Sequence, residues 1–446
     1  MGIPSYFIHI VKTHGSIIKK FQRKNIIINN LYIDSNSIIY DGIREVEYKN
    51  DNEIFEQKLI TWVCEKIFYY IKLIDPIEKV LIAFDGVAPV AKLEQQRNRR
   101  YKTWYVNNKN NDKNPEIKWD TTAITPGTKF MDKLYNGVTK YFNNIYKRQN
   151  KLEIIISGSN TCGEGEHKIY KYIRNNEQYH KDTNTIVYGL DADLIMLTLV
   201  HLKISENLYL FRETPQFITS INSNLLPNEH YVLDIYELGE KLKYEMSNKQ
   251  SNKQSNNKSM SAYINDYIFL GFFLGNDFMP HFPALNIRTD GINIMLETYT
   301  KLFGNTNNVL IDEKKIHWKN LRMFIQELAK HEEEYCVKEM KHRAIIEKKT
   351  INNIPIQKWN NLTISIDTRT LDVYLDGKLV NSFILHGLYK NKNDNNRINF
   401  INENNVDVLL VRSATKVRQD LMSHCEMVSG IEILDSYVKK SDEVKL

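Results

Sequence analysis

The chain has 446 residues, of which 42% are hydrophobic and 26% charged, the composition of a soluble globular protein with room for two or three domains. Its formal net charge of +6 is compatible with a nucleic-acid partner but too small to indicate one by itself. No apolar run is as long as a membrane span, and the four cysteines form no CxxC pair. These observations argue against a membrane protein, a disulfide scaffold and a cysteine-based zinc site.

The start of the chain and its cysteines bear on location. The opening segment MGIPSYF has no basic region followed by a long apolar core, so we expect no secretory signal. The cysteines lie far apart, as is typical of free thiols in a reducing compartment. We therefore expect a cytoplasmic protein with no membrane partner, and the nucleus is the alternative location.

Short runs rich in Ile and Val alternate with longer helical patterns through the first half of the chain. The runs predict strands at 30–34, 79–85, 152–157, 184–191 and 206–213. Continuous apolar strands separated by helices are typical of a mostly parallel sheet with helices on both faces. The sequence therefore predicts an α/β fold, in which function gathers just beyond the carboxyl ends of the strands.

The second half of the chain has a different pattern of polar and apolar residues. Residues 246–260 form a polar, low-complexity stretch that we interpret as a disordered insertion. Residues 261–345 follow a helical pattern, whereas 352–390 show period-two alternation and an Asp-Gly turn, which predict antiparallel hairpins. We expect a main domain over 1–245 with a helical continuation and a small β-rich appendage, and we leave 391–446 unassigned.

Acidic residues follow the predicted strands. They are Asp34, Asp85, Glu164, Glu166, Asp191, Asp193 and, after the apolar segment YIFLGFFLGND, Asp277. Each alone could be a turn residue or a helix cap. Together on one rim they would repel one another unless divalent cations lie between them, and oxygen-only ligation suits Mg²⁺ or Mn²⁺. Two such ions about 3.5–4 Å apart activate a water and stabilise the leaving oxygen of a phosphodiester.

A basic helix is predicted directly after the turn at Asp85. On the segment VAPVAKLEQQRNRRYK, residues Lys92, Gln96, Arg99 and Arg100 fall on one helical face. Such a face can hold a phosphate through charge-assisted hydrogen bonds. An ordinary solvated basic helix has the same spacing, and the adjacent acids favour the phosphate site.

Seven segments match characteristic segments of one known family, in both sequence and order. They are MGIPSYF, LYIDSNS, FDGVAPVAKLEQQRNRRYK, ITPGTKFM, GSNTCGEGEHKI, GLDADLIML and DYIFLGFFLGNDFMPHFP. From Met1 to about Arg343 the chain thus resembles the 5′→3′ exoribonucleases of the XRN type. The resemblance implies a PIN-like, flap-nuclease-like core that degrades single-stranded RNA bearing a 5′ monophosphate, using Mg²⁺. We expect two Mg²⁺ ions, Mn²⁺ as a substitute, a monomeric chain, and a decapping enzyme as the upstream supplier of substrate.

The resemblance also implies roles for individual residues. It makes all seven acids catalytic metal ligands, and it places Lys92, Gln96, Arg99 and Arg100 in the pocket that reads the 5′ phosphate. Tyr40 stands where the family usually has a histidine that stacks on the first base. A tyrosine ring can still stack there.

The chain departs from the family pattern elsewhere. Val90 replaces a basic residue of the phosphate segment, the long C-terminal domains of large members are absent, and the second stacking tryptophan cannot be placed, with Trp318 and Trp359 as candidates. Residues 354–380 resemble a piece of a laminin-G-like sandwich, which we interpret as a structural hairpin. The chain is short, joins segments of two kinds, and uses Asn, Ile and Lys heavily, as proteins of AT-rich genomes do. We expect these features of a large DNA virus, in which case the location would be the host cytoplasm or a virus factory.

Two other functions stay open at this stage. A flap-endonuclease-like DNA nuclease would share the carboxylate rim, but the segment QQRNRRYK matches the RNA enzymes. An inactive RNA-binding protein could keep the fold, but we would expect it to have lost at least one of the seven acids.

Overall fold

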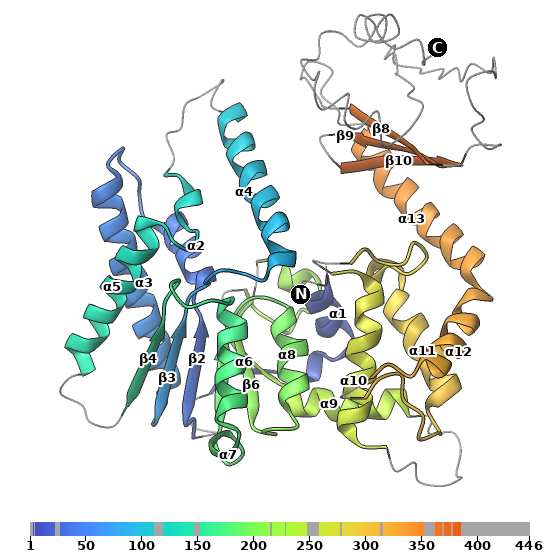
Figure 1. Ribbon diagram of the computed structural model, residues 1–446, viewed down its shortest axis with the longest axis horizontal. Helices are drawn as coiled ribbons and strands as arrows, with labels where there is room; N and C mark the ends of the chain where they lie inside the picture. The colour runs from blue at the N-terminus through green and yellow to red at the C-terminus, as the bar shows by residue number, and fades with distance from the viewer. Residues whose placement is uncertain are drawn as a thin grey trace, which may run out of the picture. The chain divides into compact units, whose positions relative to one another are not determined.

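The computed structural model describes residues 3, 5–22, 27–110, 119–146, 152–214, 216–227, 229–247, 258–276, 279–312, 315–351, 362–367, 370–375 and 378–384. The chain divides into two units, Met1–Cys336 and Val337–Leu446. A seven-stranded sheet belongs to the first unit and a three-stranded sheet to the second (Figure 1). Within the described ranges, no helix has the length and apolar character needed to cross a bilayer.

The seven-stranded sheet is parallel at its centre and antiparallel at one edge. Its order is β1-β7-β6-β5-β2-β3-β4. Strands β6 to β4 in this order pair in parallel, while β7 runs antiparallel to both β6 and β1. The strands are β1 (Ile18–Lys20), β2 (Asn30–Asp34), β3 (Lys79–Ala83), β4 (Glu153–Ser157), β5 (Thr185–Tyr188), β6 (Leu208–Glu213) and β7 (His230–Asp234).

Helices cover both faces of this sheet and bury two separate hydrophobic clusters (Figure 1). One face packs against α2 (Asn36–Glu45), α3 (Asn52–Ile74) and α5 (Lys129–Tyr146). The other face packs in a larger cluster with α1 (Tyr6–Thr13), α6 (Gly165–Asn175), α8 (Asp193–His201), α9 (Ile235–Met246), α10 (Met260–Gly271), α11 (Gly291–Phe303) and α12 (Trp318–Ala329). This is the arrangement that apolar parallel strands require, because both of their faces must be removed from water.

Apart from the helix at 332–351, which is described below, the remaining helices are short or stand apart. They are α4 (Val90–Asn110), α7 (Glu177–His180) and the 3₁₀ turns Gly15–Ile17, Thr121–Ala123, Gln216–Ser220, Phe272–Leu274 and Ile287–Thr289. Helix α4 projects away from the sheet in Figure 1. Its polar sequence explains why: the helix has no continuous apolar stripe to bury.

Side-chain caps fix where several helices begin. Asp51 accepts hydrogen bonds from the amides of Glu53 and Ile54 at the start of α3, and Asp234 accepts one from Glu237 at the start of α9. Ser259 does the same for Ala262 at the start of α10. These acceptors satisfy amides that a helix leaves unpaired in its first turn.

The predicted α/β fold with a mostly parallel sheet is confirmed, and all five predicted strands are present. The strand at 30–34 has the predicted bounds, and the other four are shorter than predicted. The prediction missed β1 and β7. Strand β1 has only three residues, IKK, and its two lysines are exposed, so it carries no apolar signal. Strand β7 lies between β6 and β1, and its five-residue segment HYVLD buries only Tyr231 and Leu233, which is a short apolar signal.

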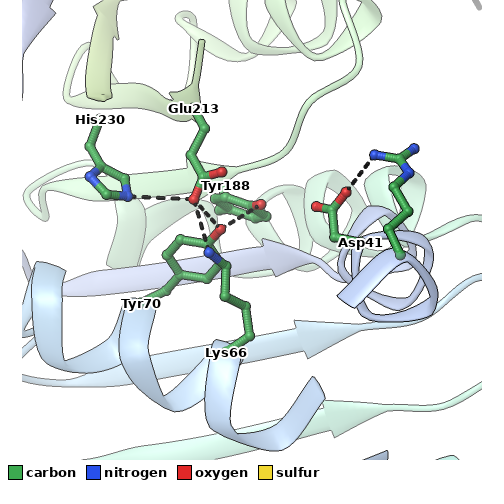
Figure 2. Close-up of polar contacts among 7 residues, drawn as sticks. Asp41, Lys66, Tyr70, Tyr188, Glu213 and His230 are labelled. Atoms are coloured by element: carbon green, nitrogen blue, oxygen red, sulfur yellow. Dashed lines mark hydrogen bonds and ion pairs between the residues drawn. The ribbon is translucent and has the colours of Figure 1, made fainter. Parts of the chain in front are cut away.

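A polar network ties β6 and β7 to helix α3 (Figure 2). Glu213 accepts a hydrogen bond of 2.6 Å from the hydroxyl of Tyr70 and one of 3.2 Å from the ammonium of Lys66. His230 lies 3.4 Å from the same carboxylate oxygen, and the hydroxyl of Tyr70 also lies 3.0 Å from that of Tyr188. The network secures the end of β6 beside the strand ends that carry the predicted site.

The second unit contains an antiparallel sheet of order β10-β9-β8, formed by β8 (Leu362–Asp367), β9 (Thr370–Leu375) and β10 (Lys378–Ile384). These strands lie within the segment 352–390. Helix α13 (Glu332–Ile351) begins in the first unit and continues into the second. Most of the predicted polar insertion, and the whole of 391–446, lie outside the described residues.

Candidate metal and phosphate-binding site

Six of the seven predicted acids lie at the carboxyl ends of the parallel strands. Asp34 is the last residue of β2, Asp85 follows β3, and Asp191 follows β5. Glu164 and Glu166 lie at the start of α6, and Asp193 is the first residue of α8. The seventh acid, Asp277, lies outside the described residues.

The sheet order explains why these acids meet. Strands β3 and β4 extend from one side of β2, whereas β5 and β6 extend from the other. The direction in which successive strands are added to the sheet therefore reverses between β2 and β5, and open α/β sheets bind ligands at such a place. Asp34 and Asp191 lie at this switch point.

The acids at these strand ends affect one another's pKa. Burial raises the pKa of Asp34 well above its usual range, and Asp85, Glu166 and Asp191 raise it further. Burial and the charge of Asp193 raise the pKa of Glu166 to about 8.

The same causes act on the acids beside them. Burial and the charge of Asp193 raise the pKa of Asp191. Burial also raises the pKa of Asp85; the amide of Gly165 opposes this rise and Glu164 adds to it. Packed like charges of this kind are stable when a cation is held between them.

Two carboxylate oxygens in the site are buried without a hydrogen-bond partner. They are Oδ1 of Asp34 and Oε1 of Glu166. Native proteins rarely leave a buried polar atom unpaired, because its desolvation is then uncompensated. A divalent cation would supply the missing partner, and an all-oxygen donor set suits a hard ion. The residues present therefore fit a metal site.

His167 lies beside two of these acids. Its Nε2 is 3.9 Å from Glu164 and 4.0 Å from Glu166, and one donor atom from each of the three residues lies within 4.8 Å of the others. His167 is 40% exposed, so it faces the open side of the site.

Asp85 is fixed by partners that the sequence prediction missed. The side-chain amide of Asn36 donates a hydrogen bond of 2.6 Å to Oδ2 of Asp85. In return, the backbone amide of Asp85 donates one of 3.0 Å to Oδ1 of Asn36. The backbone amide of Gly165 donates to Oδ1 of Asp85 at 2.7 Å. Asn36 lies two residues after Asp34 in the segment LYIDSNS, a polar position at a strand end that could have been noted.

Gly165 also allows helix α6 to approach β2. A Cβ atom at this position would lie 2.4 Å from Oδ1 of Asp34 and 3.2 Å from the carbonyl oxygen of Ala83. Any larger residue would therefore displace a candidate ligand. One turn later, the buried Lys168 donates hydrogen bonds of 2.7 Å to the carbonyls of Phe84 and Gly158. These bonds attach α6 to the ends of β3 and β4.

The basic helix α4 contacts the acids through its first two turns. The ammonium of Lys92 lies 2.9 and 3.1 Å from the two carboxylate oxygens of Glu164, and the amide of Gln96 donates to Glu164 at 3.4 Å. Arg99 and Arg100 lie about one turn further along the helix, where Arg99 is exposed and Arg100 is half-buried. The predicted phosphate face thus begins at the metal site.

Three further residues from the sequence analysis are exposed. Tyr40, on α2, is 36% exposed, and Val90, the first residue of α4, is 85% exposed. Trp318, at the start of α12, is 70% exposed. Trp359 lies outside the described residues.

Arg212 is a buried cation that the sequence prediction did not identify. Its guanidinium lies 3.6 Å from the ring centroid of Phe7, and its Nε atom has no hydrogen-bond partner. Burial lowers the pKa of Arg212 to about 10, and the charge of Asp191 opposes that decrease. Arg212 on β6 thus brings one positive charge toward the acids.

Two family models match the chain in sequence order. The XRN 5′-3′ exonuclease N-terminus matches residues 1–214, and the Xrn1 helical domain matches residues 257–372. The chain belongs to the XRN family of 5′-3′ exonucleases. The first match contains the six described acids and α4, and the second extends beyond α13 to β9.

Curated XRN proteins share this part of the chain. The 5′-3′ exoribonuclease 1 of Schizosaccharomyces pombe is 31% identical over 75% of this chain and 26% of its own length. The enzymes of the same name from Saccharomyces cerevisiae and Homo sapiens are 30% and 29% identical, over 74% and 75% of this chain. This chain covers 23% and 20% of those two proteins, so it spans about a quarter or less of the relatives named here.

Solved structures include a more distant resemblance. The catalytic core of Rad2 in complex with DNA substrate matches with a TM-score of 0.38 and 14% sequence identity, over 80% of this chain and 81% of that one. A resemblance at this level has no bearing on function.

Proposed function

We propose that this chain is a metal-dependent 5′→3′ exoribonuclease that degrades single-stranded RNA with a 5′ monophosphate to nucleoside monophosphates. The observation that carries the proposal is the pair of unpartnered buried oxygens, on Asp34 and Glu166, within a six-acid site that Lys92 adjoins. Membership of the XRN family supports the direction of degradation and the RNA substrate.

The acids would hold two Mg²⁺ ions, for which Mn²⁺ would substitute. Asp34, Asp85, Glu164, Glu166, Asp191 and Asp193 would provide the oxygens, and Asp277 would complete the set. When bound, such ions supply a water nucleophile at neutral pH and stabilise the charge that builds on the phosphodiester. The hydrogen bonds from Asn36 and Gly165 would keep Asp85 oriented for this purpose.

The first turns of α4 would hold the 5′ end of the RNA. Lys92 and Gln96 already lie at hydrogen-bond distance from a carboxylate, so the same groups can bind the oxygens of a terminal phosphate. Arg99 and Arg100 would extend this pocket. Holding the terminal phosphate would fix the distance from the 5′ end to the bond that is cleaved.

Tyr40 would stack on the first base. Its ring is 36% exposed on α2, which begins two residues after Asp34. Stacking of a base on an aromatic ring contributes about 1–3 kcal/mol. A decapping enzyme that leaves a 5′ monophosphate would supply the substrate, and the chain would act as a monomer in the cytoplasm.

The test is degradation of one 30-nucleotide RNA labelled at its 3′ end, prepared with a 5′ monophosphate, hydroxyl or triphosphate. With Mg²⁺, we expect the monophosphate RNA to shorten from its 5′ end much faster than the other two RNAs, which should resist degradation. Asp193→Asn should abolish cleavage, whereas Asp182→Asn, a matched change at an exposed aspartate, should not. Circular dichroism of both variants would show that they are folded.

Three other outcomes would each contradict a part of the proposal. Equal cleavage of all three RNAs would mean that the α4 pocket does not read the phosphate. Cleavage of branched DNA alone would indicate a flap-type DNA nuclease. RNA binding without cleavage would indicate an inactive binding protein.

A further inference from the structure

Helix α4 has a row of exposed side chains that the metal and phosphate site does not use. Its members are three or four residues apart, so they lie on one side of the helix. They are Val90, Leu93, Arg97, Tyr101 and Trp104, and we call them the α4 row. The row is apolar and aromatic except at its centre, where Arg97 interrupts it.

The α4 row and the phosphate face are different sides of the same helix. With 3.6 residues per turn, their centres are about a third of a turn apart. The phosphate face turns toward Glu164, which Lys92 and Gln96 contact. A ligand bound to the α4 row would therefore not have to displace either of these contacts.

The α4 row is exposed as a group. Val90, Tyr101 and Trp104 are 85%, 67% and 50% exposed, and Leu93 is 39% exposed. None of the four belongs to either hydrophobic cluster that the structure describes, and α4 projects away from the sheet (Figure 1). A single exposed apolar residue is ordinary, but a grouped set on one side of a helix is typical of a binding surface.

The two aromatic rings of the row hold each other in place. Their centroids are 5.9 Å apart, and their planes are inclined by 29°, which is a stacked arrangement. This contact restricts the rotation of Tyr101 and Trp104, so less entropy is lost when a ligand binds. Both rings remain at least half exposed, so each can still stack on a flat ring of a ligand.

The charge of α4 favours an anionic ligand. The helix contains six Lys or Arg residues and one Glu between Val90 and Asn110. Arg97 is exposed within the row itself, where its guanidinium can form two parallel hydrogen bonds to a phosphate. Cationic groups interleaved with exposed aromatic rings are the combination that binds single-stranded nucleic acid.

We propose that the α4 row binds internal nucleotides of single-stranded RNA, with bases stacked on Tyr101 and Trp104 and a phosphate held by Arg97. The proposal takes from the proposed function only the class of ligand, RNA. An acidic protein helix could match the charge of α4. Its apolar face would, however, bury the guanidinium of Arg97, and burial of an unpaired charge is costly.

The test measures binding of a circular 30-nucleotide single-stranded RNA with an internal fluorophore to the full chain in EDTA. A circular RNA has no 5′ end, so its binding depends neither on the terminal phosphate nor on cleavage. The proposal can therefore fail while the proposed function stands, and the reverse. Tyr101→Ala and Trp104→Ala should each weaken binding by about 5- to 100-fold, whereas Tyr101→Phe and Trp104→Phe should keep most of the affinity.

The charge of the row is tested separately. Arg97→Met should reduce the slope of log K against log salt by about 0.7, which is the contribution of one neutralised phosphate on a single strand. Arg97→Lys should keep the slope. None of these changes should alter the preference for a 5′ monophosphate over a 5′ hydroxyl in linear RNA, because the row contacts internal nucleotides.

Two controls make the result specific. Tyr244→Ala removes an exposed aromatic residue on α9 and should leave the affinity for circular RNA unchanged. Heparin has anionic groups but no bases, so Tyr101→Ala and Trp104→Ala should leave its binding unchanged. Circular dichroism would show that every variant is folded.

Two outcomes would overturn the proposal. Unchanged RNA affinity in both alanine variants would mean that the rings do not stack on bases, and a protein would then be the better occupant of the α4 row. A loss of affinity in Arg97→Met alone would reduce the row to a non-specific basic surface.

Discussion

Lys92 of α4 forms an ion pair with both carboxylate oxygens of Glu164, at 2.9 and 3.1 Å. Glu164 is buried at the start of α6, and the side chain of Lys92 is 15% exposed. The pair therefore joins the proposed phosphate pocket to the proposed metal site. Phosphate and metal would compete with this pair from opposite sides, so binding of either one should favour binding of the other.

The first prediction concerns this lysine. Lys92→Met should lower kcat/KM on 5′-monophosphate RNA by about 10- to 100-fold, because it removes a charge-assisted contact of about 1.5–3 kcal/mol. Activity on 5′-hydroxyl RNA should change less. The ratio of the two rates measures the effect, and Arg97→Met on the same helix provides the matched control. An unchanged ratio would show that Lys92 does not contact the terminal phosphate.

The second prediction concerns stability without metal. The pKa of Asp34 is raised in the folded state, so its ionisation costs stability once the pH rises above about 3.9, the value in an unfolded chain. Asp34→Asn should therefore raise the melting temperature in EDTA at pH 7.5 and abolish stabilisation by Mg²⁺. Thermal denaturation with and without metal tests both parts. The gain in EDTA should disappear below about pH 4, where the wild-type acid is also neutral.

The third prediction concerns the close approach at Gly165. Gly165→Ala places a methyl group 2.4 Å from Oδ1 of Asp34, so this side chain must move. We expect a loss of about 1–3 kcal/mol in stability and about a 100-fold loss in activity, because a ligand is displaced. Gly15→Ala, whose new atom would meet only the end of the Asn222 side chain at 3.1 Å, should keep full activity. Retained activity in Gly165→Ala would show that Asp34 is not a required metal ligand.

The fourth prediction concerns the attachment of α6. Lys168→Met removes two hydrogen bonds, to the carbonyls of Phe84 and Gly158, and should cost about 2–4 kcal/mol in unfolding free energy. Because α6 carries Glu164 and Glu166, metal affinity should fall as well. Urea unfolding and calorimetric titration with Mg²⁺ measure the two effects. Lys171→Met, an exposed change on the same helix, is the control.

The fifth prediction concerns acid stability. Burial alone would raise the pKa of Glu213, but His230, Tyr70 and Lys66 lower it to about 2 (Figure 2). A depressed carboxylate pKa contributes stability above the unfolded value of about 4.3, and that stability is lost as the pH falls toward 2. Glu213→Gln should cost up to about 3 kcal/mol at pH 7, and the difference from wild type should shrink between pH 5 and pH 3. A difference independent of pH would show that the loss comes from packing.

The sequence predicted the strands and the acids because both depend on local patterns. An apolar run that ends in Asp34 or Asp85 identifies a strand and its exit without knowledge of its neighbours. The sequence also predicted the helical face of Lys92 and Gln96. It could not predict that both side chains contact Glu164, because that contact joins residues on separate elements.

The residues that support the site were missed for the same physical reason. Asn36 and Gly165 are ordinary polar and turn residues until β2, β3 and α6 come together around Asp85. In the sequence, Lys168 looks like a surface lysine on an amphipathic helix. In the structure it is buried and donates hydrogen bonds to two backbone carbonyls. Strand β1 depends on pairing with β7, which lies more than 200 residues later in the chain.

The order of strands in the sheet also sets the order of assembly during synthesis. Strands β2, β3 and β4 can pair as soon as they leave the ribosome, but β2 keeps one open edge until Thr185–Tyr188 arrives as β5. Asp191 and Asp193 reach Asp34 only at that step, so the metal site is completed late. A nascent chain that stops before β5 presents an apolar, unpaired strand edge, the feature that most readily recruits other chains. For this protein, translational pausing before residue 185 should therefore promote aggregation more than pausing after β6.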